Sequence, residues 1–329
     1  MMGKYLIYVF ACLYAIFGWT LNFQLGFLSE QNIASDMDAR DAGAALVLPA
    51  LTAFLIMGNL AINKVGANAL AQLSSVNKTW DTKRLKSHFT HFLNLNTIRC
   101  LKFVIVLAVV AASTYLIASG VLFYESTNDM RVVLLLQAVP LWTSILLILN
   151  SIYNVYRVLR KILRYRLRLS LFEVEKLSPI GHFLITVFFI FCGALAIYAL
   201  NILFIPLSTI DIALITVFSL IMLAALILPL NTLQTTLTQQ KQEALQNLNL
   251  QLLEHIGQSN KAKTNRRLVD DHKRLQYVSD LLLVRKELSS QSSMPVSQST
   301  VIKLMVLFFL PLLSWVGAGV VSQMLKIIE

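Results

Sequence analysis

The residue types best suited to chemistry in this chain are cations that recur along one face of a helix. They stand at Arg157, Arg160, Lys161, Arg164 and Arg168. At roughly 100° per residue, these positions predict a single stripe about 100° wide. Such a row of like charges repels itself unless an anion lies along it. The stripe therefore predicts a site for a phospholipid head group, a nucleotide, an oligonucleotide or an acidic partner helix. The alternative is anchoring, in which the same side chains reach lipid phosphates at the membrane surface.

A second group of cations, between residues 261 and 274, extends this hypothesis. Arg266 and Arg267 lie within it and join the candidate ligand site. Asp270 and Asp271 interrupt the group, so contacts between residues three or four apart are expected to neutralise part of it. An ordinary solvated surface is the simpler interpretation. If both groups act together, they hold a polyanion whose affinity falls steeply with salt.

Amide side chains form another candidate constellation. Asn59 and Asn63 lie one helical turn apart near the end of an apolar run, and Asn150 and Asn154 repeat this spacing on another. Amides at such positions can line a wet pore or vestibule. They can equally form hydrogen bonds between neighbouring helices, each contributing about 0.6–2 kcal/mol. Both interpretations stay open, and helix packing is the more common use of such residues.

The sequence carries no catalytic signature. It has no Walker A motif, no GxGxxG, no HExxH and no pair of intramembrane aspartates. The three cysteines, Cys12, Cys100 and Cys192, are widely spaced and form no CxxC pair. We therefore expect neither an enzyme nor a site for a cofactor or metal, and we expect these cysteines to be small packing residues.

The composition places these residues in a membrane protein. Of the 329 residues, 57% are hydrophobic and 14% are charged, whereas soluble domains have about 45–50% and 25%. A soluble enzyme, a disordered chain and a disulfide scaffold are thereby excluded. A helix needs roughly 20 apolar residues to cross a bilayer. Seven stretches meet this length, at about 5–27, 43–62, 103–124, 132–153, 183–206, 210–232 and 302–323.

The predicted fold is an all-α integral membrane protein with about seven transmembrane helices and a cytosolic helical hairpin domain. The hairpin follows from two amphipathic patterns separated by the polar break at 257–263. The predicted organisation is two transmembrane helices (1–62), a cytosolic amphipathic segment (63–102), transmembrane helices three and four (103–156), a basic cytosolic helix (157–182), transmembrane helices five and six (183–232), the hairpin with a polar tether (233–300) and transmembrane helix seven (301–329).

The distribution of charge predicts the orientation. Basic residues are retained on the cytoplasmic side. With the N-terminus inside, the inner segments hold 25 cations and 9 acids, and the outer segments hold 3 and 8. We therefore expect a multi-pass protein of the plasma (inner) membrane, with its N-terminus cytoplasmic and its C-terminus outside. No predicted span has a charged residue in its middle, which argues against ion-coupled transport.

These observations favour one functional class. The sequence predicts a homo-oligomeric, bacterial-type membrane channel or membrane-perturbing effector, gated through its basic cytosolic helical face by an anionic ligand such as a nucleotide or oligonucleotide, or by a partner. The alternative is a non-conducting membrane scaffold or subunit whose cytosolic hairpin recruits a soluble partner. The expected partners are the lipid bilayer, further copies of the chain, and an anionic ligand, a nucleic acid or a soluble protein.

Overall fold

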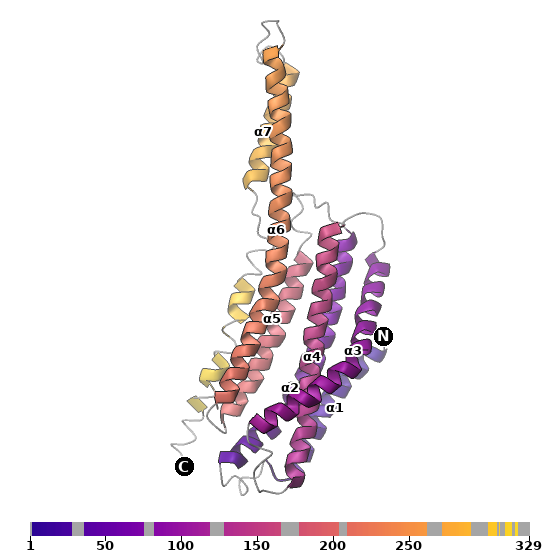
Figure 1. Cartoon of the computed structure of the whole chain (residues 1–329), viewed down its shortest axis with the longest axis vertical. Helices are drawn as coiled ribbons and strands as arrows, with labels where there is room; N and C mark the ends of the chain where they lie inside the picture. The colour runs from indigo at the N-terminus through magenta and orange to yellow at the C-terminus, as the bar shows by residue number, and fades with distance from the viewer. Residues whose placement is uncertain are drawn as a thin grey trace.

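The computed structural model consists of long helices (Figure 1). It describes residues 2–27, 36–75, 82–118, 128–165, 178–203, 209–261 and 272–290, with short pieces of 302–321. The described elements are α1 (Met2–Gln24), α2 (Asp36–Ser75), α3 (Thr82–Ala118), α4 (Asn128–Tyr165), α5 (Ser178–Tyr198), the 3₁₀ helix η4 (Ala199–Leu203), α6 (Thr209–Lys261) and α7 (His272–Ser290). Within these ranges there is no strand, so the all-α prediction is confirmed for the described part of the chain.

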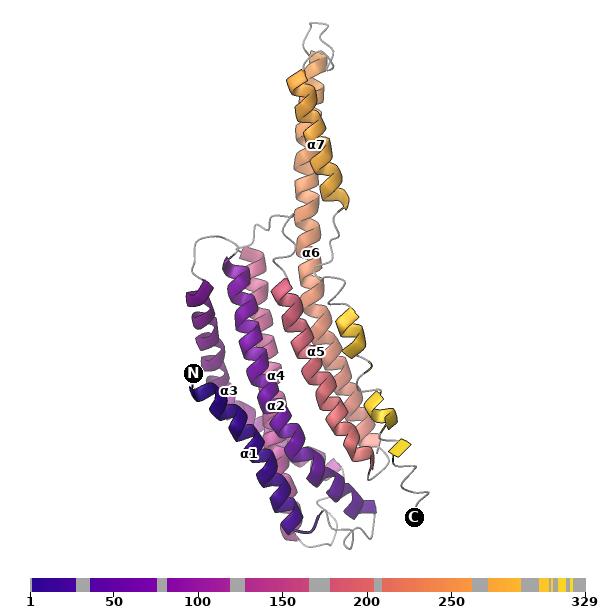
Figure 2. The ribbon, with the colours of Figure 1, turned by 180° about the vertical axis from the view of Figure 1, so that it is seen from behind.

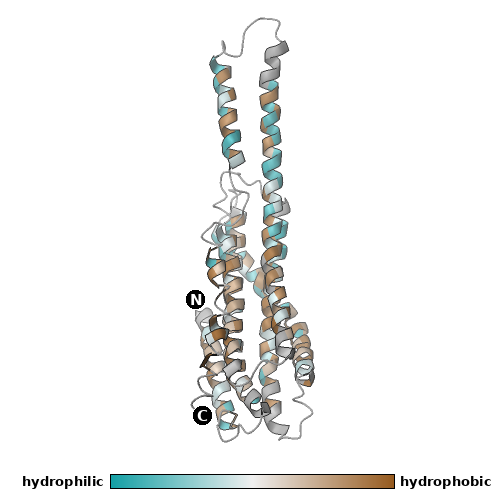
Figure 3. Cartoon of the chain, turned by 90° about the vertical axis from the view of Figure 1, so that its left-hand side faces the viewer, coloured by the Kyte–Doolittle hydropathy of each residue, from teal (hydrophilic) through white to brown (hydrophobic). Residues whose placement is uncertain are grey.

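Six of the helices, α1 to α6, are long and apolar enough to cross a membrane. Apolar residues follow the lengths of these helices, and hydrophilic residues are more frequent on the projecting part of the molecule (Figure 3). This is the architecture of a multi-pass membrane protein. The seventh predicted span, 302–323, is described only as short helical pieces such as 302–307 and 313–317, and the count of seven stays a prediction.

Several helices are longer than a bilayer requires. The 40, 37 and 38 residues of α2, α3 and α4 correspond to lengths of about 55–60 Å, against a hydrocarbon core about 30 Å thick. We call the end of the bundle where α2 and α4 finish and α3 begins the arm end. The predicted cytosolic segment 63–102 does not form an element of its own. Its first part continues α2 and its later part begins α3.

A two-helix arm projects from this end. The 53 residues of α6 continue well past the other helices, and α7 returns along its distal part (Figure 1). Leu252 is buried with Val278 and Leu281 between the two helices. Near the base of the arm, Lys241 Nζ donates to the carbonyl of Ser289 at 3.0 Å. These contacts make α7 antiparallel to α6, while residues 262–271 lie outside the description.

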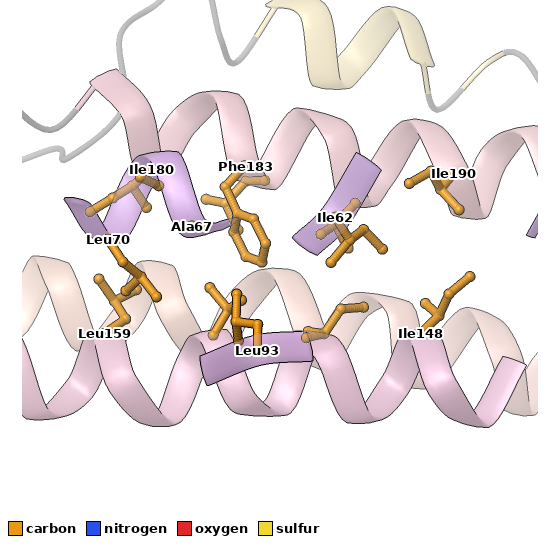
Figure 4. Packing of buried hydrophobic residues seen from close by; sticks show 14 of the residues in the cluster. Ile62, Ala67, Leu70, Leu93, Ile148, Leu159, Ile180, Phe183 and Ile190 are labelled. Atoms are coloured by element: carbon orange, nitrogen blue, oxygen red, sulfur yellow. The ribbon is translucent and has the colours of Figure 1, made fainter. Parts of the chain in front are cut away.

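Helix α2 lies at the centre of the bundle and contacts α1, α3, α4 and α5. Its side chains interleave with those of α4 and α5 in one apolar cluster, and α3 adds Leu93 (Figure 4). Small residues let these helices approach closely. A β-carbon on Gly66 would lie 2.6 Å from Val155 Cγ2, and one on Gly58 would lie 2.8 Å from Ile190 Cγ2. Close backbone approach of this kind is the main source of helix association in apolar surroundings.

Helix α1 docks where a proline interrupts α2. Pro49 has no N–H, so the carbonyl of Ala45, four residues earlier, lacks its helical donor. Asn22 Nδ2 donates to that carbonyl at 2.6 Å, and Gln137 Nε2 of α4 donates to Asn22 Oδ1 at 2.7 Å. Gly18 packs on the ring of Pro49. Figure 2 shows α1 along this part of α2. One buried amide thus joins three helices.

The close approach at Gly66 gives a stability prediction. Gly66→Ala is expected to lower the free energy of unfolding in detergent by about 1–3 kcal/mol, because Val155 is buried and β-branched and cannot move aside. The matched control is Gly317→Ala, since a β-carbon at Gly317 meets no atom within 4 Å. Thermal and denaturant unfolding of both variants measure the difference. Equal stability of the two variants would show that Gly66 does not set the spacing of α2 and α4.

Candidate functional site

The predicted cationic stripe lies on the last turns of α4. Arg157, Arg160 and Lys161 are exposed. Val155 and Leu159, on the opposite side of the helix, are buried in the apolar cluster. The hydrophobic residues between the cations thus hold α4 against the bundle and turn the stripe outward. Arg164 lies in the final turn of α4, and the structure describes its backbone only.

Three of the predicted ligand residues cannot be placed. Arg168, Arg266 and Arg267 lie outside the described residues. Their membership of the site stays a prediction, as does any joint action of the two cationic groups.

Helix α3 brings further cations to the same end. Lys83, Arg84 and Lys86 are exposed in its first turns. Asn96 Nδ2 of α3 donates to Asn154 Oδ1 of α4 at 2.7 Å, which fixes the register of these antiparallel helices. Counting from that pair, Lys86 is level with Arg164. We define the cationic face as six exposed residues: Lys83, Arg84, Lys86, Arg157, Arg160 and Lys161.

Neither α3 nor α4 has an Asp or Glu near these cations that could neutralise them. The sequence has no Asp or Glu from Thr82 to Ala118, and none between Asp129, at the far end of α4, and Glu173. Sequence reasoning used the α3 cations for orientation only, because nothing local in the sequence places α3 beside α4. The absence of acids from both stretches is the feature of the sequence that could have indicated a shared cationic face.

The four predicted amides lie between the helices of a single chain. Ser151 Oγ of α4 donates to Asn59 Oδ1 of α2 at 2.8 Å, and Asn154 accepts from Asn96. Together with Asn63 and Asn150 they form what we call the amide layer, at the base of the cationic face. It consists of Asn59, Asn63, Asn96, Asn150, Ser151 and Asn154. These direct hydrogen bonds are of the kind that hold neighbouring helices together. That any of these residues lines a pore stays a prediction.

The amide layer keeps unused hydrogen-bonding capacity. Asn63 Oδ1, Asn150 Nδ2 and Asn154 Nδ2 are buried and make no hydrogen bond within the described structure. Leaving a buried polar group unpaired costs about 1–3 kcal/mol. One spare acceptor and two spare donors suit water or a polar ligand group. Asn96 and Ser151 were not predicted, because their role depends on which helices are neighbours.

Further toward the other end, the interior is apolar. A cavity of about 150 Å³ lies among α2, α4, α5 and the start of α6. Its walls include Leu51, Trp142, Phe191 and Phe218. Apolar cavities of this size stay dry and accept apolar molecules. The amide layer therefore does not continue into this space as a polar path.

The chain matches no known protein family. No curated protein and no solved structure matches it either. What the chain does must be argued from the cationic face, the amide layer and the arm.

The bond between Asn96 and Asn154 gives the next prediction. A double-mutant cycle of Asn96→Ala and Asn154→Ala is expected to show a coupling energy of about 0.6–1.7 kcal/mol, the range for hydrogen bonds between transmembrane helices. Unfolding free energies in detergent measure it. Asn94 is exposed two residues away on α3, so Asn94→Ala with Asn154→Ala is the matched control, with no coupling expected. Equal coupling in both cycles would mean that the bond does not join α3 to α4.

Proposed function

We propose that the chain is the subunit of a homo-oligomeric membrane channel or membrane-perturbing effector that an anionic ligand controls. The observation that carries the proposal is the cationic face: six exposed cations on two adjacent helices, in stretches of the sequence that contain no acid. The expected ligand presents phosphate groups, as nucleotides and oligonucleotides do. Arginine forms paired hydrogen bonds with phosphate, and lysine adds a point charge.

The position of the α3 cations favours an anion there. Lys83 and Arg84 lie in the first turn of α3, which contains no acid, and Lys86 follows in the next turn. Asp81 directly precedes the helix in the sequence. A helix N-terminus carries a partial positive charge, so cations in this turn are disfavoured and a bound anion is favoured. Arg160 and Lys161 lie at the same end of α4, the helix adjacent to α3, so an anion bound at this end can neutralise cations of both helices.

The positive-inside rule assigns the two ends of the bundle. The arm end carries the cationic face, so we place it in the cytosol, with the N-terminus cytoplasmic and the C-terminus outside, in a plasma (inner) membrane. The ligand is then a cytosolic anion.

The amide layer offers a way to couple the ligand to the membrane-spanning helices. An anion that draws the ends of α3 and α4 together acts on the register that Asn96 and Asn154 set. It then favours whichever arrangement of the spans fits the closer spacing. Because the interior of one copy is lined by apolar side chains such as Leu51 and Ile148, a conducting path would run between copies.

The main test reverses three charges of the stripe. In Arg160→Glu/Lys161→Glu/Arg164→Glu, binding of a short single-stranded oligonucleotide or of inorganic triphosphate is expected to weaken. The slope of log affinity against log salt is expected to fall by about 2 for the oligonucleotide. Ion flux from reconstituted liposomes should lose its response to the same probes, while insertion into membranes is unchanged.

The matched control reverses Lys64, Arg285 and Lys303, three exposed cations outside both cationic groups. It is expected to keep the salt slope and the flux response. If the stripe variant binds both probes and conducts like the unchanged chain, control by an anion at this face is wrong.

The projecting arm favours the second candidate function, a non-conducting scaffold. Leu250 and Leu253, in the part of α6 that packs against α7, are exposed, and a soluble partner can bind them. Deleting residues 237–290 should then release a soluble partner and leave ion flux unchanged. A change in flux on deletion argues instead for the channel or effector.

A further inference from the structure

The arm has two apolar faces that its own helices leave uncovered. Leu250 and Leu253 of α6 are 64% and 67% exposed, and Leu275, Leu282 and Leu283 of α7 are 39%, 47% and 58% exposed. The stretch of α6 that precedes them, residues 239–247, is mostly polar, and the arm stands clear of the other helices (Figure 1). Two helices can bury only one face each against the other. The second face of each needs a partner.

The two exposed faces carry opposite charges. At roughly 100° per residue, Glu243 falls on the same side of α6 as Leu250 and Leu253, roughly 150° from the face that contacts α7. On α7, Lys286 falls beside Leu275 and Leu282, roughly 120° from the face that contacts α6. Glu243 and Lys286 are both exposed. One face is therefore apolar and acidic, and the other is apolar and basic.

We propose that these faces bind each other between copies of the chain, so that the outer face of α6 in one copy packs on the outer face of α7 in the next. The register supports this pairing. The Lys241–Ser289 bond shows which residues of α6 and α7 are level within an arm, and copies in one membrane stand at the same height. Glu243 then lies within about one residue of the level of Lys286, and Leu250 within about two of Leu282.

The contact is head-to-tail, since it joins two different faces. Such contacts form rings when each step turns in the same sense. A path from the preceding copy to the next one crosses α6 and then α7. Its direction changes by roughly 30° at α6, where the two contact faces are roughly 150° apart, and by roughly 60° at α7, where they are roughly 120° apart. Because α7 is antiparallel to α6, both changes have the same sense and add to roughly 90°. The arms therefore close into a ring of about four copies. The inference rests on the homo-oligomer of the proposed function, but not on conduction or on control by an anion.

Disulfide cross-linking in membranes containing the full chain tests the contact. The native cysteines at 12, 100 and 192 are free thiols and are first replaced by serine or alanine. Leu250→Cys/Leu282→Cys is expected to give a ladder of oligomers on mild oxidation. Each single variant has one thiol per chain and should give no disulfide-linked dimer, because like faces do not meet. Mixing the two single variants should give dimers without a ladder.

Two further comparisons sharpen the test. Gln251→Cys/Asp280→Cys places thiols at matching levels on exposed positions away from both faces and should give no ladder. Glu243→Lys or Lys286→Glu, added to the cross-linking pair, should lower its yield about two- to fivefold, as expected for an exposed ion pair. The two charge changes together should restore it.

Three results would overturn the inference. They are dimers from either single variant in the same yield as the cross-linked product of the double variant, no ladder from the double variant whose unfolding matches the unchanged chain, and no recovery in the charge swap. Because none of these readouts measures flux or anion binding, the arm contact can fail while the proposed function stands. The reverse also holds, since a ladder from a chain that neither conducts nor binds the probes would support the arm contact alone.

Discussion

The close packing of α2 is the constraint on which the rest of the structure depends. In an apolar solvent, helices gain little from hiding hydrophobic side chains, so association relies on dispersion contacts at short range and on hydrogen bonds. Gly58 and Gly66 supply the short range, since a side chain at either position would collide with α5 or α4. Once α2 holds α4 by its Val155 side, the other side of α4 has to face outward. The orientation of the cations therefore follows from a glycine on another helix.

Polar side chains in this bundle donate hydrogen bonds to backbone carbonyls of neighbouring helices. Pro49 deprives a carbonyl of its donor, and Asn22 replaces that donor from α1. The chain repeats this use of side chains near its end, where Ser314 Oγ and Trp315 Nε1 donate to the carbonyls of Ala196 and Leu195 at 3.0 and 3.2 Å. Those carbonyls lie in the last turn of α5, just before the chain tightens into η4. In both cases a side chain from another helix donates to a backbone carbonyl.

The sequence predicted most of what depends on one helix at a time. Length and hydropathy predicted the helices that can span a membrane, and the helical period predicted a stripe on α4 with apolar residues opposite. It did not predict the reach of α2, because Pro49 and Asn59 resemble interruptions and the run after Ile62 is rich in small and polar residues. In the structure that run is buried at Ala67, Leu70 and Leu73. Small residues have low hydropathy and yet pack well against other helices.

The features that the sequence could not predict depend on which helices are neighbours in the folded chain. Asn96 and Lys86 acquire a role only because α3 lies beside α4 in one register, and no local pattern encodes that pairing. The same holds for the two faces of the arm. The leucine spacing predicts two amphipathic helices, but only their mutual packing shows that each keeps a second apolar face exposed. Sequence periodicity gives the faces of a helix, and the tertiary structure decides which of them are already occupied.

The unequal packing of the helices bears on how the proposed assembly would move. Among the six helices, α2 buries the largest share of its apolar window and α6 the smallest, and Ile215 and Phe218 of α6 form part of the wall of the 150 Å³ cavity. Tightly packed interiors move as units, whereas a seam with missing contacts separates at lower cost. If the arms hold the α6 helices together, the remaining helices of each copy become a unit that carries the cationic face. A ligand at that face would then act across the least packed boundary in the molecule, which is where a small difference in binding free energy shifts an equilibrium most readily.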